Sequence, residues 1–476
     1  MSEPGAILLV ACYELGHQPL SLASPLAVLR RGGFTPAAVD TSVSDLDDAT
    51  IARARLVAIS APMHTALRLG TRVAARVRAL NPTAHICFYG LYATLNSDYL
   101  LGGVADSVIG GEYEEALLAL AQSLAMPTGE PVPGVRTREH NAAPVLRRLD
   151  HATPARETLP TPQSYAYLVR GDEVVPAGYV EASRGCLHTC AHCPITPVYG
   201  GRFFVIPRPL VLEDIRAQVR AGVGHITFGD PDFLNGPRHS LEIVRALHAE
   251  FPHVTFDATI KVEHILERRE VFVELAALGC AFVVSAVESL SADVLRHLKK
   301  GHSRADVAEA LRILDDAGIP MRPTFVAFTP WTTARDYLDT LDFIAEQGLV
   351  EHVDPIQYAI RLLVPPDSAL LDDPDGTGWL GPLDAEALSY TWRHSDPRMD
   401  ALQREVQALV ESAAHAREPI PVTFAAIREL AYERLGEPVA ALVGAAVAIG
   451  EESGGATGAL RRARRPVPHL SEPWFC

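Results

Sequence analysis

Three of the seven cysteines in this chain lie within eight residues, in the segment Cys186-Leu-His-Thr-Cys190-Ala-His-Cys193. The C-x3-C-x2-C spacing places three thiols on one short loop after a predicted strand. Three thiolates can bind three irons of a cubic [4Fe–4S] cluster, which leaves the fourth iron open to a small chelating ligand. A zinc site completed by His188 or His192 is the alternative, but zinc motifs usually come as two paired halves, and the sequence contains no second CxxC or HxxxH. The pattern therefore predicts an iron–sulfur protein.

The other cysteines and the composition narrow the class of protein further. Cys12, Cys87 and Cys280 lie in apolar, strand-like contexts, where buried thiols are expected. An odd cysteine count without a recognisable leader argues against a disulfide framework. The net charge of −16 excludes a general binder of phosphate backbones, and the longest apolar run, near 439–449, is too short to span a bilayer. We expect a cytoplasmic protein that binds neither nucleic acid nor membrane.

The N-terminal part of the chain alternates short apolar strands with helices. Strand patterns recur at Ala6–Cys12, Leu56–Ser60 and His85–Tyr89, with helical stripes between them. Such βαβ alternation predicts a doubly wound, Rossmann-like domain over residues 1–124. Residues 125–178 are rich in proline and poor in periodicity, so we expect a linker there.

Strand–helix alternation resumes after the linker and predicts an α/β barrel over 179–371. The expected strands are Tyr179–Ser183, His225–Gly229, Val254–Ala258, Ala281–Glu288, Met321–Phe328 and Asp354–Leu362. Six βα units suggest a partial (βα)6 barrel, with active residues where the strands end. We expect a helical region over 372–450 and a flexible tail over 451–476 that ends in Cys476. The predicted fold class is thus α/β, with a doubly wound domain, a partial barrel and C-terminal helices.

The cysteine motif after the first of six βα units resembles the radical S-adenosylmethionine (SAM) superfamily over about 179–371. The resemblance implies that SAM chelates the open iron and that reduction of the cluster cleaves the SAM sulfonium, normally to a 5′-deoxyadenosyl radical. It makes Cys186, Cys190 and Cys193 the catalytic cluster ligands. It also implies that His192 contacts the adenine, although His192 could equally be an ordinary loop residue.

Further positions resemble SAM contacts of that superfamily more weakly. Glu288, at the end of the fourth strand, matches a position that often contacts the ribose, and Lys300-Gly301 matches a step often found after the next helix. The sixth strand contributes Arg361, which could hold a carboxylate or simply pair with an acidic neighbour. The end of the second strand resembles the segment that receives the SAM amino group, and its candidate residues are Gly229, Asp230, Pro231 and Asp232. A plain Gly-Asp-Pro turn is the alternative. The fifth strand departs from the family, because Phe328-Thr-Pro-Trp331 replaces its usual glycine-rich end.

The N-terminal domain resembles the cobalamin-binding domain that precedes the barrel in one class of these enzymes. Gly110-Gly111-Glu112 matches a Gly-Glu turn near the end of such domains. The D-x-H-x-x-G motif that supplies a lower histidine ligand to cobalt is absent, as it is from many relatives. The resemblance therefore leaves two alternatives open, a domain that binds cobalamin and a degenerate domain that only shapes the substrate cleft.

The last residues, Leu470-Ser-Glu-Pro-Trp-Phe-Cys476, resemble the CUAEP/CCAEP-tail radical SAM family, in which U is selenocysteine. In that family a cysteine is followed by selenocysteine or a second cysteine and then by Ala-Glu-Pro. We therefore hypothesise that a selenocysteine codon follows Cys476 and was read as a stop. Cys476 would then be part of a substrate-capturing or redox tail. A frayed terminus with an incidental thiol is the alternative.

Taken together, these patterns predict a radical SAM enzyme that modifies a small-molecule substrate, with a reducing protein such as flavodoxin or ferredoxin as electron donor. Three chemistries compete: hydrogen abstraction by the adenosyl radical, cobalamin-dependent methylation, and aminocarboxypropyl transfer from SAM to a soft acceptor such as arsenite. A non-enzymatic iron–sulfur sensor is the rival class. The missing second cysteine cluster argues against branches of the family that carry auxiliary clusters.

Overall fold

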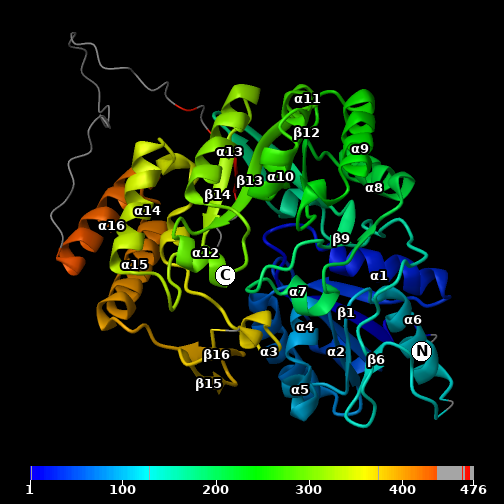
Figure 1. The fold of residues 1–476 in the computed structure, drawn as a ribbon. Coiled ribbons are helices and arrows are strands. Elements are labelled where there is room, and N and C mark those ends of the chain that lie inside the picture. Colours follow the sequence, from blue (N-terminus) through cyan, green and yellow to red (C-terminus); the bar gives the residue numbers. More distant parts are fainter. Residues whose placement is uncertain (2, 128, 374, 437–463, 465–466, 472–476) are drawn as a thin grey trace, which may run out of the picture. The chain divides into compact units, whose positions relative to one another are not determined.

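The computed structural model describes the whole chain except residues 2, 128, 374, 437–463, 465–466 and 472–476 (Figure 1). It divides into two compact units, each described by itself. Unit 1 comprises Met1–Thr259, Leu363–Thr391 and the residues from His469 onward. Unit 2 comprises Ile260–Leu362 and Trp392–Pro468. None of the described helices is long and apolar enough to cross a bilayer.

The regular elements alternate between strands and helices along most of the chain. The strands are β1 (Ile7–Ala11), β2 (Ala37–Asp40), β3 (Leu56–Ser60), β4 (His85–Tyr89), β5 (Ser107–Ile109), β6 (Val135–Arg136), β7 (Tyr167–Arg170), β8 (Glu173–Val180), β9 (Ser183–Gly185), β10 (Phe203–Val205), β11 (His225–Phe228), β12 (Thr255–Thr259), β13 (Cys280–Glu288), β14 (Met321–Phe325), β15 (Leu380–Asp384), β16 (Ser389–Trp392) and β17 (His469–Leu470). The α-helices are α1 (Leu20–Arg31), α2 (Asp48–Arg53), α3 (His64–Leu80), α4 (Leu91–Leu95), α5 (Ser97–Tyr99), α6 (Glu114–Ala125), α7 (Ile195–Tyr199), α8 (Arg208–Arg220), α9 (Pro237–Glu250), α10 (Val262–Glu267), α11 (Val271–Ala277), α12 (Ala292–His297), α13 (Arg304–Ala317), α14 (Ala334–Glu346), α15 (Pro397–Ala416) and α16 (Ile420–Leu435). Short 3-10 or π turns are η1 (Leu100–Val104), η2 (Pro162–Ser164), η3 (Phe233–Asn235), η4 (Val350–His352), η5 (Pro355–Tyr358) and η6 (Ala369–Asp372).

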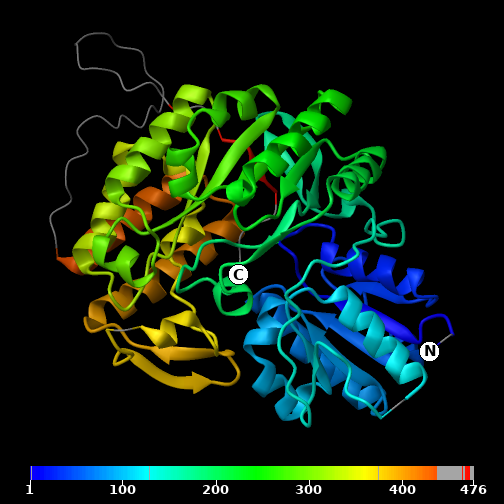
Figure 2. The same ribbon diagram turned by 45° about the vertical axis from the view of Figure 1, so that its right-hand side comes forward.

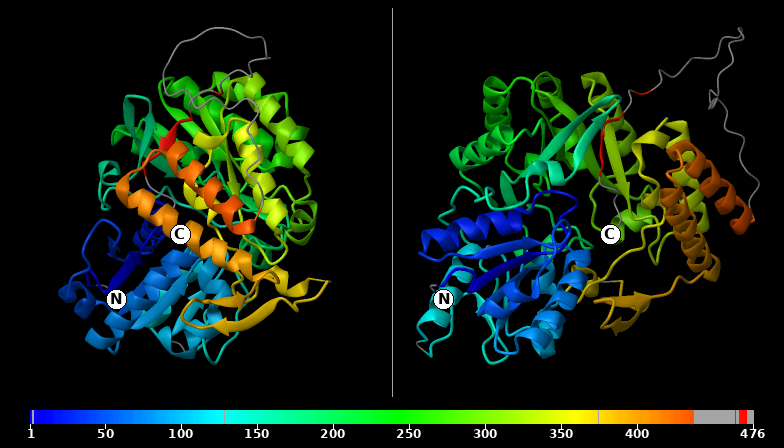
Figure 3. Two further views of the ribbon diagram at one scale, coloured as in Figure 1. Left: turned by 90° about the vertical axis from the view of Figure 1, so that its left-hand side faces the viewer. Right: turned by 180° about the vertical axis from the view of Figure 1, so that it is seen from behind.

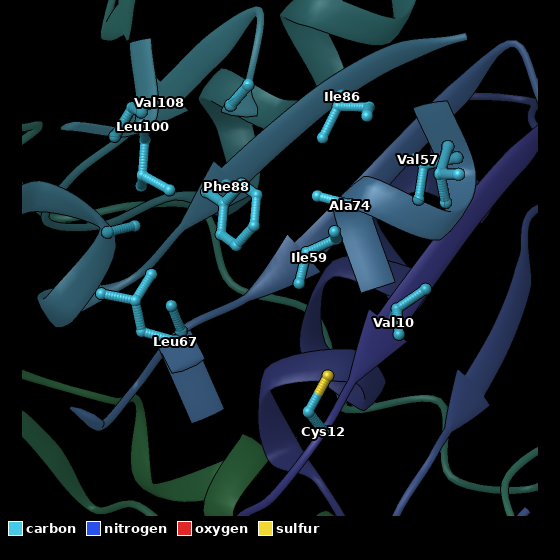
Figure 4. Close-up of a cluster of buried hydrophobic side chains, with 14 of the residues drawn as sticks. Val10, Cys12, Val57, Ile59, Leu67, Ala74, Ile86, Phe88, Leu100 and Val108 are labelled. Carbon is cyan, nitrogen blue, oxygen red and sulfur yellow. The ribbon is translucent and has the colours of Figure 1, made fainter. Parts of the chain in front are cut away.

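The N-terminal domain is built on a six-stranded sheet of order β2-β1-β3-β4-β5-β6, parallel except for β6. Side chains alternate between its two faces, so Val10, Val57 and Ile59 pack with Leu67 of α3 on one face (Figure 4). The opposite face packs against α1 and α6. Because both faces are covered, the strands are apolar throughout. The predicted doubly wound domain is confirmed.

The second sheet begins earlier in the chain than predicted. Strand β8 starts at Glu173 rather than Tyr179 and forms an antiparallel hairpin with β7, inside the predicted linker 125–178. Two β-branched runs flank the turn Gly171-Asp172, a hairpin signal that the proline content obscured. Strands β8, β11 and β12 are parallel neighbours, and β17 pairs with β7, as the red arrow in Figure 3 shows.

The predicted flexible tail, 451–476, therefore contains a segment that pairs with β7. The amide of Ser471 donates to the carbonyl of Tyr167, and the amide of Tyr167 donates to the Ser471 hydroxyl. These bonds extend the β7–β17 pairing by one residue. Cys476, on which the selenocysteine hypothesis depends, lies outside the described residues, as do residues 437–450 of the predicted helical region.

Unit 2 contains the parallel pair β13–β14, but the predicted sixth strand Asp354–Leu362 does not form. The 3-10 turn η5 occupies most of it, and the described part of the strand reduces to a bridge between Phe328 and Arg361. The reason is local: Pro355 opens the turn, and the side-chain oxygen of Gln357 accepts the amide of Phe325 that a strand backbone would otherwise bind. The fold class is nevertheless confirmed as α/β, with a curled half-barrel sheet and C-terminal helices.

The region 372–450, predicted to be helical, opens with the β15–β16 hairpin, drawn in yellow-orange in Figure 2. A Cβ atom at Gly381 would lie 2.5 Å from the hydroxyl oxygen of Thr391, so the two strands approach closely at that glycine. Helices α15 and α16 follow, and the predicted apolar stripe of α15 is buried. That stripe consists of Leu402, Val406 and Val410.

Candidate iron–sulfur site

The three clustered cysteines lie on the cluster loop, which we define as residues 186–193, directly after β9. Strand β9 pairs antiparallel with β10, and the amide of Cys186 donates to the carbonyl of Arg202 at 3.0 Å. This two-stranded ribbon closes the base of the loop. Sequence reasoning missed it, because strands of three residues leave no periodic pattern.

The loop holds the thiols without joining them. Cys186 and Cys190 are buried and Cys193 is half-buried, and none of the three forms a disulfide. The amide of Cys193 donates to the carbonyl of Cys190, and the hydroxyl of Thr196 donates to the same carbonyl at 2.8 Å. Three thiols outside any disulfide on one loop fit a [4Fe–4S] cluster, because thiolates are the ligands that iron–sulfur clusters require. His192 lies half-buried between two of them, and its contact with adenine stays a prediction.

Asn235 is a site residue that the sequence did not reveal. Its side-chain amide donates to the Cys186 sulfur at 3.6 Å, and its carbonyl oxygen accepts the amide of Leu187 at 3.3 Å. Burial raises the pKa of the Cys186 thiol, and the bond from Asn235 opposes that rise by favouring the thiolate. Hydrogen bonds to cluster sulfurs also tune reduction potentials. A lone asparagine 42 residues beyond the motif carries no recognisable sequence signal.

Gly185 permits the turn into the loop. Its φ is +77°, in the left-handed region, and a Cβ atom there would lie 2.4 Å from the carbonyl oxygen of Arg202. Any side chain therefore meets both backbone strain and a collision with a backbone atom that the ribbon holds in place.

Replacing Gly185 with alanine is expected to lower the iron content of the reconstituted protein by half or more. A side chain at this positive φ adds strain of about 1–3 kcal/mol, and position 185 directly precedes the first cluster ligand, Cys186. Iron and sulfide assays per chain measure the effect. Gly200→Ala is the matched control, because Gly200 has a φ of +57° but an added Cβ would meet open space. Equal losses in both variants would show that left-handed strain alone matters.

The predicted SAM-binding segment after β11 faces the entrance to the cluster loop. Asp230 accepts the amide of Ala182 at 2.8 Å and the hydroxyl of Ser183 at 2.5 Å, and burial raises its pKa to about 7. Asp232 pairs with Nε2 of His188 at 3.2 Å and caps η3. Both carboxylates thus order the segment that carries the cysteines. Their contact with the SAM ammonium, like that of Pro231, stays a prediction.

Gly229 lies against a side chain of the neighbouring strand β8. A Cβ atom at Gly229 would lie 1.9 Å from the hydroxyl oxygen of Tyr179, so the half-buried tyrosine occupies the space that the glycine leaves. The contact of Gly229 with SAM stays a prediction.

The concave face of β8, β11 and β12 carries a polar row. Tyr179, Thr227 and Asp257 are in register on these three strands. The Asp257 carboxylate accepts from the Thr227 hydroxyl at 2.7 Å and contacts Nε2 of His225 at 2.8 Å. His17, from the loop after β1, packs its ring 5.1 Å from that of Tyr179, and its buried Nδ1 finds no hydrogen-bond partner among the described residues. The other face of the strands is apolar and faces helices.

In unit 2, Glu288 occupies a strained position at the end of β13. Its φ is +64°, rare for a residue with a side chain, and the register shifts between Ala286 and Glu288. The carboxylate is buried and lies 3.7 Å from Nζ of Lys300, which is 3% exposed. Strained, charged residues at strand ends concentrate at functional sites. The contact of Glu288 with the ribose of SAM stays a prediction.

Arg361 has partners within unit 2 that account for its charge. Its guanidinium contacts Asp400 at 2.7 Å, donates to the carbonyl of Trp392 at 2.5 Å, and stacks 3.4 Å from the Trp392 ring centroid. The sequence left open whether Arg361 holds a ligand carboxylate or pairs with an acidic neighbour. Asp400 is such a neighbour, and the contact of Arg361 with SAM stays a prediction.

Comparison with known proteins finds a family match over the part of the chain that contains the cluster loop. The radical SAM superfamily profile matches residues 180–344. Hopanoid C-3 methylase from Methylococcus capsulatus is 28% identical over 236 residues, which cover 49% of this chain and 44% of that protein. Bacteriochlorophyllide d C-12(1)-methyltransferase from Chlorobaculum tepidum is 27% identical over 172 residues, covering 35% and 37%. The chain thus matches less than half the length of these curated relatives.

Solved structures extend the likeness of fold to the N-terminal domain. The cobalamin-dependent SAM radical enzyme OxsB, with aqua-cobalamin bound, superimposes with a TM-score of 0.68 at 15% identity and covers 86% of this chain and 67% of its own. The radical SAM methyltransferase TsrM from Kitasatospora setae gives 0.58 at 17% identity, covering 72% and 71%. The part of the chain over residues 180–344, which carries the three clustered thiols on the loop after the first barrel strand, thus matches the radical SAM superfamily of enzymes.

Proposed function

We propose that the chain cleaves SAM reductively at a [4Fe–4S] cluster held by Cys186, Cys190 and Cys193 and uses the reaction to modify a small molecule. The observation that carries the proposal is the ribbon-closed loop, which presents three thiols outside any disulfide, one of which accepts a hydrogen bond from Asn235. The cluster, when bound, supplies the electron that breaks a carbon–sulfur bond of SAM. The surrounding chain holds the loop in shape through Asp230 and Gly185.

Anaerobic reconstitution with iron and sulfide, followed by reduction with SAM, tests this function. Mass spectrometry of the products separates the chemistries. 5′-Deoxyadenosine supports hydrogen abstraction, and methylthioadenosine supports aminocarboxypropyl transfer to a soft acceptor. A well-formed cluster that cleaves no SAM would favour the iron–sulfur sensor instead. The natural electron donor in this proposal is a small reducing protein of the flavodoxin or ferredoxin type.

The polar row of the concave face supports a polar substrate. This face carries the polar side chains of Tyr179, Thr227 and Asp257. A site for an apolar substrate would instead be lined by apolar side chains. His17 adds a buried ring nitrogen without a partner among the described residues. Buried polar atoms of this kind favour a ligand that can bond to them.

Glu288→Gln is expected to weaken SAM binding about tenfold, because one hydrogen bond to a charged acceptor contributes roughly 1.5 kcal/mol. The change preserves side-chain size at the strained position. Equilibrium binding of SAM to the anaerobically reconstituted protein measures it. Glu309→Gln is the control for the loss of one negative charge, because Glu309 is half-buried on α13 and pairs with Arg312. An unchanged affinity would leave Glu288 as a partner of Lys300 only.

Cobalamin-dependent methylation is the second candidate function, favoured by the methyltransferases among the relatives and by OxsB and TsrM among the similar folds. Doubly wound domains bind ligands where the strand order reverses, which here is between β1 and β3. The loops at that point are residues 13–16 and 62–64, and both are half-buried, so they are accessible to a ligand. They suit a cobalamin that is held without a lower histidine ligand. Cobalamin, when bound, carries a methyl group between SAM and the substrate. One cobalamin per purified chain would select this branch.

We further propose that the chain carries a tail of the CUAEP/CCAEP type. If the chain is of the CUAEP/CCAEP-tail type, the codon after Cys476 is UGA and is followed by codons for Ala-Glu-Pro. Reading those codons in the gene tests the idea directly, and any other codon after Cys476 overturns it. A Cys–selenocysteine pair would give the enzyme a soft nucleophile for an acceptor such as arsenite.

A further inference from the structure

One carboxylate of the N-terminal domain contacts both ends of the segment that carries the cysteines. Glu112 follows β5 and is fully buried. Its Oε1 accepts the hydroxyl of Tyr199 at 2.9 Å, and its Oε2 lies 3.3 Å from Nη1 of Arg184. Arg184 stands two residues before Cys186, and Tyr199 stands six residues after Cys193. The cluster loop therefore lies between the two contacts of a single side chain.

Arg184 is held by more than one acid. Its Nη1 lies 2.7 Å from Glu114 and its Nε lies 2.6 Å from Glu181, while its guanidinium covers the ring of Tyr113 at 5.3 Å. The side chain is 10% exposed. Buried charges with several partners tolerate little displacement, because loss of one partner leaves another charge uncompensated in a poorly solvated place. The orientation of Arg184, and with it the start of the loop, is thus strongly determined.

The Gly-Gly turn explains why Glu112 can reach the loop. Gly111 has a φ of +70°, and a Cβ atom there would lie 2.3 Å from the carbonyl oxygen of Val145. The amide of Glu112 donates to that same carbonyl at 2.8 Å. Only glycine permits this approach. The turn that resembles a cofactor-domain signature is filled by the protein's own backbone, and its glutamate faces the cysteine segment.

Apolar packing supports the same junction. Val198 and Tyr199 of α7 form a small buried cluster with Leu95 of α4, and Phe204 of β10 packs against it. The cluster excludes water from the Glu112–Tyr199 bond, which strengthens the bond.

We propose that Glu112 is a positioning residue that clamps the cluster loop from the N-terminal domain by holding Arg184 and Tyr199 at once. The clamp sets the separation of the two chain ends between which the three ligands lie. This gives the N-terminal domain a role in cluster assembly that needs no cofactor of its own. The proposal rests on the proposed function for the identity of the cluster, but the ordering of the loop does not depend on it.

Glu112→Ala and Glu112→Gln test the clamp, with Arg156→Gln as matched control. Arg156 makes a buried two-pronged ion pair with Asp214, at 2.6 and 2.9 Å, and is not in contact with the cluster loop. The first readout is amide hydrogen exchange over 183–204 in cluster-free protein. The second is iron per chain and the electron paramagnetic resonance spectrum of the reduced, SAM-bound protein.

Glu112→Ala is expected to speed exchange over 183–204 by about tenfold or more, leave β1–β4 unchanged, halve the iron content or worse, and alter the spectrum. Glu112→Gln keeps an acceptor for Tyr199 and should fall between Ala and the parent chain. Arg156→Gln should lower thermal stability without moving either readout.

Unchanged exchange and spectrum in Glu112→Ala overturn the clamp, and so do equal effects in Arg156→Gln. If Glu112→Ala does not fold, Tyr199→Phe removes only one arm and must reproduce a smaller version of the same changes; no change in that variant overturns the clamp. Failure of the parent chain to bind a cluster, with faster loop exchange in Glu112→Ala, would defeat the proposed function and leave the clamp standing.

Discussion

Replacing Cys190 with alanine is expected to reduce SAM cleavage to background, a loss of at least about a hundredfold. Even residues that only orient metal ligands cost about 10–100-fold when they are changed, so loss of a ligand must cost more. The loop offers only three thiols, and Cys190 is the central one. The measurement is formation of 5′-deoxyadenosine or methylthioadenosine by the reconstituted protein, together with iron per chain.

Cys280→Ala is the matched control for this variant. Cys280 is also a buried thiol outside any disulfide, but it lies at the start of β13 in unit 2 and donates to the carbonyl of Phe282. Its replacement removes about the same volume and should leave iron content and SAM cleavage unchanged. Full SAM cleavage in Cys190→Ala would contradict the assignment of the cluster to this loop.

Replacing Gly229 with alanine is expected to destabilise the protein by about 3 kcal/mol or more, the upper range for overpacking a well-packed interior. The new methyl group would meet Tyr179, whose hydroxyl and ring carbon lie 1.9 and 2.0 Å from its position. Tyr179 packs against His17 and cannot move away freely. We expect a thermal midpoint lowered by about 6–12 °C, since 1 kcal/mol shifts it by about 2–4 °C in a chain of this size.

Gly224→Ala provides the comparison on the approach to the same strand. An added Cβ there would lie 3.1 Å from a side-chain carbon of Val175, a tight contact that small shifts relieve. Its effect on the thermal midpoint should be less than half that of Gly229→Ala. A stable Gly229→Ala protein that has lost only SAM affinity would support the prediction that the glycine admits SAM.

The local parts of this protein could be predicted from the order of its residues. The spacing of Cys186, Cys190 and Cys193 places three ligands on one loop, because residues this close in sequence stay on one short segment whatever the rest of the chain does. Apolar periodicity likewise predicts α3, which buries one face, and a continuous apolar run predicts β1, which is buried on both faces. Both kinds of pattern depend on contacts between near neighbours along the chain.

Sequence patterns do not reveal the places where a distant side chain replaces a local rule. The sixth strand is absent because the Gln357 side chain bonds the amide of Phe325, 32 residues away. Asp230 orders Ser183 across 47 residues rather than only facing a ligand, and Gly229 makes room for the side chain of Tyr179. No periodicity records such pairs.

The sequence alone therefore determined the chemistry: three thiols on one loop, on an α/β frame, predict an iron–sulfur site and the superfamily. How that loop is held in place was visible only in the folded chain. Glu112 meets Tyr199 across 87 residues of sequence and Arg184 across 72. The reason is physical, because a buried charge must find a partner, and the partner is whichever group the packing of strands and helices brings within reach.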